Sequence, residues 1–459
     1  DAGRYRVIVS NAAGSVSSAE VVLTVLPGTQ TPGSVDSSFC APLTGDGAIL
    51  ALSEQPDGKL LIGGWFTNMN GFSCTSLTRL WPDGIPDRNF QVTLSGDYGP
   101  TVSAIAMQLD GRIVIGGSFT NVNGSARAYV ARLNPDGSLD AGVNAPGGLF
   151  NRVTAVSLQS DGKVLVAGHN YDEIGSIGVL IRFNADGSLD PGYSIITHDG
   201  YGIVALAVQP DDQALVAGEF DPIGGVGGRC LARIKPDGSV DAGFAPHPGS
   251  ELYGLALQAD GRILVSGYVG LDDVGLVRLF ADGSFDSAFR PALTAPPMES
   301  LVVVQPDGKI LIGGDWGGAQ MPGIAQLNAD GSQDRFFHPG SGIAEGGQVW
   351  AMLVQHDGKI IVGGDFAQFN GVPCQGLVRL NGDPPASPCR LIASLCPRTG
   401  LPQFTLTGPF GAIVVIEATS DLQAWTPLMT VTNTLGTVQI CDPTANGSPQ
   451  RFYRAHRIE

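Results

Sequence analysis

Acidic and aromatic residues stand side by side at several points of the sequence that are typical of loops. They are Asp97 and Tyr98, His198 and Asp199 with Tyr201, and Asp315 and Trp316. Aromatic rings stack on the apolar faces of sugars, and carboxylates accept strong hydrogen bonds from hydroxyl groups. These residues therefore predict a ligand-binding surface that suits carbohydrate. The alternative is that the aromatic side chains pack between structural elements and the acids are solvated.

Sequence motifs of known catalytic sites are missing. The chain has no nucleophile elbow, no His-Glu-x-x-His segment and no phosphate-binding glycine loop, and its six histidines are scattered. We therefore predict no catalytic residues and expect that the chain is not an enzyme. The alternative is a polysaccharide hydrolase or lyase in which acidic residues from distant segments converge at a central channel.

A second motif has oxygen-bearing side chains at alternating positions, as calcium loops do. In the segment from Asn134 to Asp140 these are Asn134, Asp136, Ser138 and Asp140. The motif lacks the bidentate glutamate and recurs along the chain, where Asp-Gly has its own reason to form a tight turn. We expect no cofactor, with calcium as the alternative. The last aspartate is expected to cap a neighbouring backbone or to pair with the arginine of the third strand, as Asp140 with Arg132.

A repeat of about fifty residues positions all of these groups. The segment 55–64, Gln-Pro-Asp-Gly-Lys-Leu-Leu-Ile-Gly-Gly, returns almost unchanged at 305–314 and in looser form five more times. Each of the seven units reads as four short strands joined in part by Asp-Gly turns, with no helical spacing. Four strands per unit, repeated around an axis, is the architecture of a β-propeller.

The ends of the repeat array favour a closed ring over an open solenoid. The seventh unit runs into Asp383-Pro384-Pro385 after its third strand, and proline cannot continue a sheet. Residues 33–39, before the first unit, match the fourth strand found at 238–244. We therefore predict an all-β fold in which residues 28–383 form a seven-bladed β-propeller with strand-swap closure.

Seven cysteines without Cys-x-x-Cys spacing argue against a zinc site. Cys40 follows the swapped strand and Cys374 opens the third strand of the seventh unit, so we predict a disulfide between them. A second disulfide, Cys396–Cys441, is predicted in the C-terminal region, with Cys389 as the competing partner. Disulfides would imply an oxidising compartment, whereas free thiols would suit a cytosolic protein.

The units resemble the delta-60 repeat, a bacterial β-propeller repeat of unassigned biochemical role. The resemblance rests on stretches such as 116–124, Gly-Gly-Ser-Phe-Thr-Asn-Val-Asn-Gly, and 133–140, Leu-Asn-Pro-Asp-Gly-Ser-Leu-Asp. It covers about residues 33–383, although units three, five and six lack the Phe-Thr-x-x-Asn-Gly loop. It implies a secreted or surface-attached multidomain protein, and it offers no catalytic residues to carry over.

Both flanks are similar to other modules. Residues 1–27, with Asp1-Ala2-Gly3-Arg4-Tyr5, resemble the C-terminal hairpin of an immunoglobulin-like domain and its tyrosine corner. Residues 389–459, with Trp425 and the segment 450–455, resemble a small fibronectin-III-like β-sandwich. The preceding strands of an immunoglobulin-like domain are not in this sequence, so the hairpin could exchange strands with another chain.

Composition narrows the function classes. The 459 residues carry a net charge of −17, without the basic clusters that a nucleic-acid backbone requires. No apolar run is long enough for a membrane span. We predict a secreted or cell-surface binding or structural scaffold that presents its loop face to polysaccharide or protein partners. The alternatives are the enzyme described above and a self-assembling homo-oligomer or filament subunit.

Overall fold

The structure is a computed structural model that falls into two compact units, residues 1–382 and 383–459. Each unit is described by itself. The residues described are 3–5, 8–11, 14–17, 21–23, 31–97, 99–171, 176–198, 200–246, 248–269, 274–293, 298–315, 323–343, 346–383, 390–395, 402–407, 413–419, 425–432, 437–441 and 452–458.

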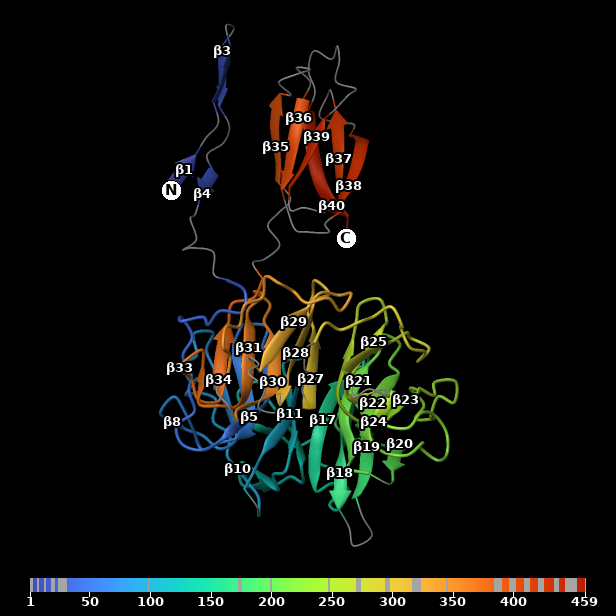
Figure 1. Ribbon diagram of the computed structural model, residues 1–459. Helices are drawn as coiled ribbons and strands as arrows, with labels where there is room; N and C mark the ends of the chain where they lie inside the picture. Colours follow the sequence, from blue (N-terminus) through green and yellow to red (C-terminus); the bar gives the residue numbers. More distant parts are fainter. Residues whose placement is uncertain are drawn as a thin grey trace. The chain divides into compact units, whose positions relative to one another are not determined.

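Seven antiparallel sheets follow one another along the first unit (Figure 1). The innermost strands are β5 (Ala48–Glu54), β11 (Val102–Met107), β17 (Arg152–Leu158), β21 (Gly202–Val208), β24 (Gly249–Leu257), β27 (Met298–Val304) and β30 (Gln348–Val354). The second strands are β6 (Leu60–Trp65), β12 (Ile113–Gly117), β18 (Val164–Tyr171), β22 (Ala214–Glu219), β25 (Ile263–Val269), β28 (Ile310–Asp315) and β31 (Ile360–Asp365). The third strands are β9 (Leu77–Leu80), β15 (Val130–Leu133), β19 (Ser176–Phe183), β23 (Leu231–Ile234), β26 (Val274–Leu279), β29 (Ile324–Leu327) and β34 (Leu377–Leu380). The predicted all-β, seven-bladed architecture is therefore confirmed.

The fourth strand of a blade is short. It is a regular strand in blade two, β16 (Leu139–Asp140), and in blade three, β20 (Leu189–Thr197), and a single bridge such as Leu80 with Pro86 elsewhere. In blade seven the bridging residue comes from the other end of the propeller, because Val35 pairs with Leu380. The innermost strands contact one another in cyclic order, and β30 lies against β5. The sheets therefore form a ring in which residues near 35 complete the last blade.

Short hairpins extend some blades. They are β7 (Asn68–Met69) with β8 (Phe72–Ser73), β13 (Asn121–Val122) with β14 (Ser125–Ala126), and β32 (Gln368–Phe369) with β33 (Val372–Pro373). The connecting strand β10 (Leu94–Ser95) pairs with β13. These hairpins occur in blades one, two and seven and project from the face where the innermost strands begin. This face is called the loop face below.

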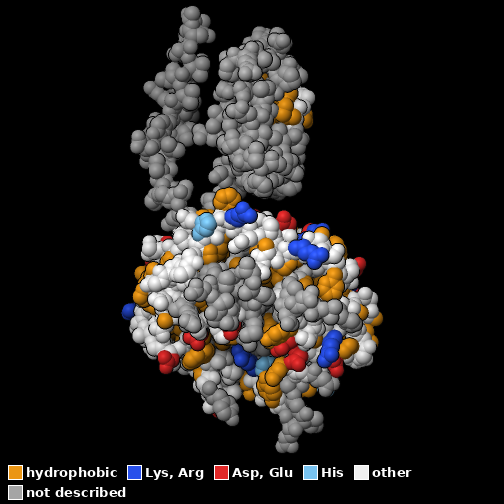
Figure 2. All heavy atoms as spheres, viewed as in Figure 1, with side chains coloured by type: hydrophobic (Ala, Val, Ile, Leu, Met, Phe, Trp, Pro, Cys, Tyr) orange, Lys and Arg blue, Asp and Glu red, His pale blue; other side chains and the backbone are white. Residues whose placement is uncertain are grey.

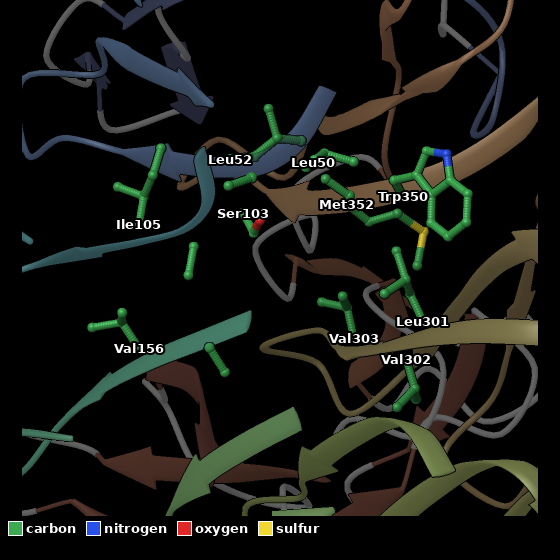
Figure 3. A pocket seen from close by; sticks show the side chains of 14 residues that line it. Leu50, Leu52, Ser103, Ile105, Val156, Leu301, Val302, Val303, Trp350 and Met352 are labelled. Carbon is green, nitrogen blue, oxygen red and sulfur yellow. The ribbon is translucent and has the colours of Figure 1, made fainter. Parts of the chain in front are cut away.

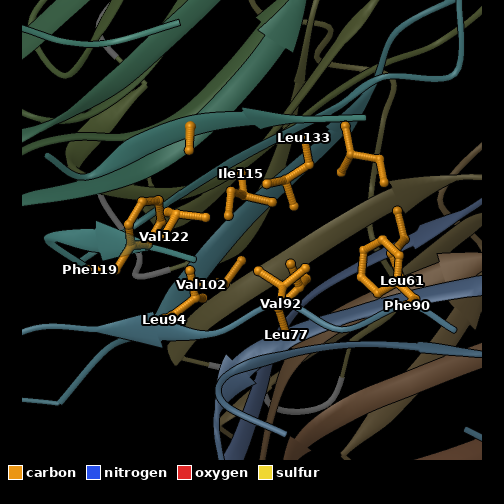
Figure 4. Close-up of a cluster of buried hydrophobic side chains, with 12 residues drawn as sticks. Leu61, Leu77, Phe90, Val92, Leu94, Val102, Ile115, Phe119, Val122 and Leu133 are labelled. Carbon is orange, nitrogen blue, oxygen red and sulfur yellow. The ribbon is translucent and has the colours of Figure 1, made fainter. Parts of the chain in front are cut away.

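The hydrophobic core is divided among the seven interfaces between neighbouring blades. Seven separate clusters of buried side chains occur, each made of residues from two adjacent blades. Figure 4 shows the cluster in which Leu61, Leu77 and Phe90 of the first blade meet Val102 and Ile115 of the second. Burying one such aliphatic or aromatic side chain stabilises the fold by about 1.5–3 kcal/mol. Each blade therefore depends on both of its neighbours.

The paired glycines of the second strand are explained by close packing. A Cβ atom on Gly63 would lie 2.7 Å from the Val102 side chain of the next blade. A Cβ atom on Gly64 would lie 2.0 Å from the carbonyl oxygen of Ala48 in the facing strand. Neither approach leaves room for a side chain, so these positions serve blade packing and do not bind phosphate.

A repeated ion pair joins the third strand to the fourth, as the sequence predicts. The arginine–aspartate pairs are Arg79–Asp87, Arg132–Asp140, Arg182–Asp190, Arg233–Asp241, Arg278–Asp286 and, between the two ends of the ring, Arg379–Asp36, at 2.6–2.8 Å. Each arginine also donates to a backbone carbonyl of the next blade, as Arg132 Nη1 does to Ala185 at 2.9 Å. One guanidinium thus connects two strands of its own blade to the neighbouring blade.

The predicted Cys40–Cys374 disulfide is wrong, because both are free cysteines. The amide of Leu43, rather than a residue next to Cys40, donates to Gln375 at 2.9 Å, so the chain has passed Cys40 before it reaches the third strand. Cys40 is exposed, whereas Cys374 packs against a hydrophobic cluster. Burial raises the pKa of the Cys374 thiol to about 11. The other predicted bond, Cys396–Cys441, involves side chains outside the described residues.

The flanking regions are also built of strands. In the N-terminal region β1 (Gly3–Tyr5) pairs with β4 (Val21–Leu23), and β2 (Ile8–Asn11) pairs with β3 (Gly14–Ser17). The second unit has two three-stranded sheets. One contains β35 (Arg390–Leu395), β36 (Pro402–Thr407) and β39 (Thr437–Cys441), and the other β37 (Ile413–Thr419), β38 (Thr426–Thr432) and β40 (Phe452–Ile458). Phe404 and Tyr453 bring the two sheets together, with ring centroids 4.4 Å apart. Among the described residues, no helix could cross a membrane.

Candidate functional site

The centre of the propeller contains a cavity of about 250 Å³. Side chains of the innermost strands point into it, as Figure 3 shows for Leu50, Ile105, Val303 and Met352 among others. Ser103 is the one lining residue with a side-chain hydroxyl; the others are aliphatic, apart from Trp350 and Met352. The side chains that line the cavity are therefore mostly apolar and include no carboxylate, so acidic groups can act only at the openings of the channel.

One opening is surrounded by side chains of unusual chemical variety. In each blade the second strand leads through a glycine to one further residue, which lies beside the beginning of the innermost strand. We call these seven positions the mouth ring. They are Trp65, Ser118, His169, Glu219, Tyr268, Asp315 and Asp365. Figure 2 shows acidic, basic and hydrophobic side chains close together at the lower edge of the propeller, where β10 and the end of β18 lie in Figure 1.

Blade three contributes a cation, an imidazole and a phenol to this opening. Arg152 begins β17 and is directly opposite His169 of β18. Tyr171 ends β18, and its ring centroid lies 4.8 Å from that of His169 in an edge-to-face arrangement. Arg152 Nε donates to Ser103 Oγ at 3.3 Å, so the guanidinium extends toward a residue that lines the cavity. The two strands thus hold three functional groups at one edge of the channel.

The electrostatics of this cluster keep His169 neutral. Burial and the positive charge of Arg152 lower the pKa of His169 to about 4. Its buried Nδ1 atom has no hydrogen-bond partner. The guanidinium of Arg152 remains charged at any physiological pH. At neutral pH the site therefore offers a fixed cation beside a neutral imidazole.

Carboxylates occupy the following blades. Glu219 accepts a hydrogen bond from the amide of Tyr201 at 3.3 Å. In blade five, Glu251 accepts a hydrogen bond from the hydroxyl of Tyr253, whose ring contacts that of Tyr268 at 6.2 Å. These groups can accept hydrogen bonds from a ligand beside exposed aromatic rings.

The residues predicted from sequence are distributed over the same face. Tyr201 is well exposed beside Glu219, and Asp315 belongs to the mouth ring, where it accepts from Gln348 Nε2 at 3.0 Å. Asp97 and His198 are exposed on connecting segments. Tyr98, Asp199 and Trp316 lie outside the described residues. The structure thus places Tyr201 and Asp315 at the opening, whereas Asp97 and His198 are exposed on connecting segments.

Sequence reasoning missed Arg152, His169 and Glu219. Each is separated by about fifty residues from its counterpart in the next blade, so nothing in the local sequence marks it. An alignment of the seven units would have shown the signal, since the position after the glycine varies between aromatic, acidic and imidazole side chains while its neighbours stay alike.

The Asp-Gly segments that resemble calcium loops are turns. Asp136 Oδ1 accepts from the amide of Ser138 at 2.9 Å, and Asp186 does the same with Ser188 at 2.8 Å. A side chain that satisfies its own turn in this way stabilises the hairpin. In the described ranges, no three histidine, cysteine or acidic side chains are placed to hold a metal ion.

A family model matches each blade of the propeller in turn. It is described as a domain of unknown function (DUF5122) beta-propeller, and the matched segments together make up more than half of the chain. They are residues 55–90, 108–142, 159–193, 209–244, 258–289, 305–337 and 355–383. The chain belongs to the DUF5122 β-propeller family. The predicted repeat architecture is thereby confirmed at the level of the family. No curated protein sequence matches the chain.

Solved structures similar to this DUF5122 protein include several enzymes. A gluconolactonase from Xanthomonas campestris is 17% identical, with 78% of this chain and 99% of that chain covered and a TM-score of 0.36. A periplasmic gluconolactonase from Pseudomonas aeruginosa is 15% identical, with 84% and 99% covered and a TM-score of 0.31. An exo-beta-1,3-galactanase from Phanerochaete chrysosporium is 11% identical, with 79% and 95% covered and a TM-score of 0.28.

These neighbours correct one expectation. The lack of sequence motifs led us to expect that the chain is not an enzyme. The comparisons contradict that expectation, since the similar structures are enzymes, and at 11–17% identity the likeness is one of fold. In a propeller, side chains that are far apart in the sequence meet around the axis, so a catalytic site need not leave a contiguous motif.

Proposed function

We propose that this DUF5122 protein is a carbohydrate-active enzyme whose site is the mouth ring on the loop face. The observation that carries the proposal is the variety of the ring positions. In an otherwise uniform repeat, the same structural position holds tryptophan, tyrosine, histidine and three carboxylates. Packing alone would favour similar residues at equivalent positions of equivalent blades.

The groups of the mouth ring suit bond cleavage in a sugar chain. Trp65 and Tyr268 are partly exposed and can stack on pyranose faces. Glu219 and Asp365 can act as acid or base in hydrolysis, and His169 can act as a base in elimination. The aliphatic side chains of the cavity beneath the ring can pack against the apolar face of a bound sugar.

The remaining proposals concern the location of the protein and the role of its flanking regions. Polysaccharide substrates are found outside cells, so we place the protein in the periplasm, in the medium or on a cell surface. We interpret residues 1–27 as part of an immunoglobulin-like module and residues 389–459 as a fibronectin-III-like module. Either could attach the enzyme to polysaccharide or to protein partners, including other copies of the same chain.

The experiment is a screen of the full chain against neutral and acidic polysaccharides, with release of reducing ends as the readout. The test variant combines Glu219→Gln with Asp365→Asn, which removes two carboxylates of the mouth ring. The matched control combines Asp83→Asn with Asp136→Asn, two exposed acids in Asp-Gly turns on the opposite face. We expect the control to keep full activity and the ring variant to lose at least about tenfold, since each carboxylate would accept a charge-assisted hydrogen bond from the substrate. Binding without cleavage by the unmodified chain would refute the enzyme and favour a sugar-binding scaffold.

A further inference from the structure

Arg152 differs from the other arginines that extend along the blades. Six arginines of the third strands each form an ion pair with an aspartate and a hydrogen bond to the next blade. Arg152 forms no ion pair within the described residues. Its one hydrogen bond there goes to Ser103, through Nε, and its Nη1 and Nη2 atoms have no partner. Although the chain has a net charge of −17, no carboxylate of the described residues pairs with this guanidinium. It is therefore available to an external anion at the channel opening.

The geometry of the Arg152 guanidinium determines which shape of anion it binds best. Nη1 and Nη2 form a planar fork that matches the two oxygens of a carboxylate, and such charge-assisted pairs are stronger than neutral hydrogen bonds. Among sugars, a carboxylate is the mark of a uronate. A mouth ring that stacks and hydrogen-bonds sugar rings, with one arginine fork at its edge, therefore suits an acidic polysaccharide.

His169 and Tyr171 stand where the reaction of a uronate needs a base and an acid. The hydrogen on the carbon next to the carboxylate becomes more acidic once the carboxylate charge is neutralised by a cation, which is the part that Arg152 can play. His169 is directly opposite Arg152 across the strand pair. Tyr171 lies beside His169 and is half exposed. A bound carboxylate would also offset the charge of Arg152, which now disfavours protonation of His169.

We propose that Arg152, His169 and Tyr171 form a uronate site that cleaves acidic polysaccharide by β-elimination. Arg152 binds the carboxylate, and His169 removes the proton from the adjacent carbon. The electrons of that C–H bond form the new carbon–carbon double bond, the bond from the β-carbon to the glycosidic oxygen breaks, and Tyr171 donates a proton to the departing oxygen. The products are an unsaturated uronate and a sugar with a free hydroxyl, and no other reactant is consumed. This inference rests on the proposed function.

The acidic groups of the mouth ring limit where the polyanion can lie. Glu219 and Asp365 repel a polyanion, and mobile ions at physiological ionic strength weaken that repulsion with distance. The site therefore accommodates one uronate at Arg152, while the carboxylates of other blades face sugar hydroxyls.

The test uses the full chain with polygalacturonate, alginate and hyaluronate as acidic probes and a galactan as the neutral probe. Two readouts run in parallel: ultraviolet absorbance, which reports the unsaturated product, and reducing ends, which report any cleavage. The variants are Arg152→Gln, His169→Asn and the control Arg229→Gln. Arg229 is an exposed arginine of the loop face that pairs with Asp221 at 3.1 Å, outside the proposed site.

We expect unsaturated product from at least one acidic probe and none from galactan. Arg152→Gln should lower kcat/KM by at least about tenfold, mainly through KM, because a charge-assisted pair is lost. His169→Asn should lower kcat by about 10²–10⁴-fold, the usual contribution of a general base. Calorimetry should show that His169→Asn still binds uronate oligomers, which demonstrates a folded site. Arg229→Gln should behave as the unmodified protein.

Three results would overturn the inference. Reducing ends without absorbance would mean hydrolysis, which leaves the proposed enzyme standing and removes the elimination. An Arg152→Gln variant no weaker than Arg229→Gln would show that the guanidinium does not bind substrate. Cleavage of galactan alone, or of no probe at all, would refute the uronate site, and in the second case the proposed function falls with it.

Discussion

Replacing Asp36 by alanine tests what closes the ring. Asp36 is 1% exposed and accepts from Arg379 Nε at 2.8 Å, from Lys359 Nζ at 2.7 Å and from the hydroxyl of Ser38 at 2.6 Å. Asp36→Ala leaves two cations without their buried acceptor. Removing one partner of a buried pair typically costs about 3–5 kcal/mol.

That cost can be converted into a melting temperature. An unfolding entropy of roughly 2.1 cal/mol/K per residue, over about 350 residues of propeller, gives a loss of about 4–7 °C if the unit unfolds cooperatively. Differential scanning calorimetry measures the shift. The matched control is Asp286→Ala, which breaks an equivalent pair with Arg278 at 2.8 Å inside one continuous blade.

Hydrogen exchange separates the two variants. In Asp36→Ala, amides near Val35 and in β34 should lose protection before any other blade, because their pairing joins distant parts of the chain. In Asp286→Ala, the exchange should remain local to blade five. A loss of less than about 1 kcal/mol in the free energy of unfolding of Asp36→Ala, which is the value of an exposed ion pair, would contradict the reasoning. So would equal exchange patterns in the two variants.

Three further predictions concern stability and the mouth ring. Burial raises the pKa of Asp36, but hydrogen bonds from Lys359 and Ser38 outweigh burial and hold that pKa well below 3.8. The ionised carboxylate therefore adds stability that is complete above about pH 4 and is lost as the pH falls further. The stability of Asp36→Asn should accordingly change less with pH in acid unfolding measurements. Gly64→Ala should cost about 3 kcal/mol in urea unfolding because its Cβ would overlap a carbonyl oxygen, whereas Gly147→Ala, with open space around it, should cost little. Trp65→Ala should weaken oligosaccharide binding about tenfold in calorimetry with no change in melting temperature. Trp81, on the opposite face, is the control. An equal loss of affinity for Trp81→Ala would show that the mouth ring is not the sugar-binding surface.

The fold could be predicted because each blade repeats the same local sequence features. Asp-Gly turns, short β-branched strands and a displaced fourth strand are visible in the sequence itself, and so is the pairing of Arg132 with Asp140. The disulfide at Cys40 could not be predicted correctly in this way. Strand order indicates which segments are neighbours, but the geometry of a disulfide depends on the register of the pairing, which places Leu43 beside Gln375.

The candidate site depends on a different kind of information. His169 and Glu219 belong to separate blades and come together only when neighbouring blades pack side by side around the axis. Local patterns led instead to loops with adjacent acids and aromatics, of which Tyr201 and Asp315 do lie at the opening. Within the described residues, Arg152 forms no ion pair, and a sequence does not indicate which arginines remain unpaired.

The pairing of Gly33 with Asn381 at 2.7 Å means that the polypeptide enters and leaves the propeller at almost the same point. Tension applied along the backbone would therefore pass across this short junction and bypass the other six blades. The ring can be carried within a longer polypeptide as a side domain, with its loop face free of strain while the connecting segments stretch. Mechanical failure would begin by peeling Val35 away from Leu380, which is a reversible step because no covalent bond has to break.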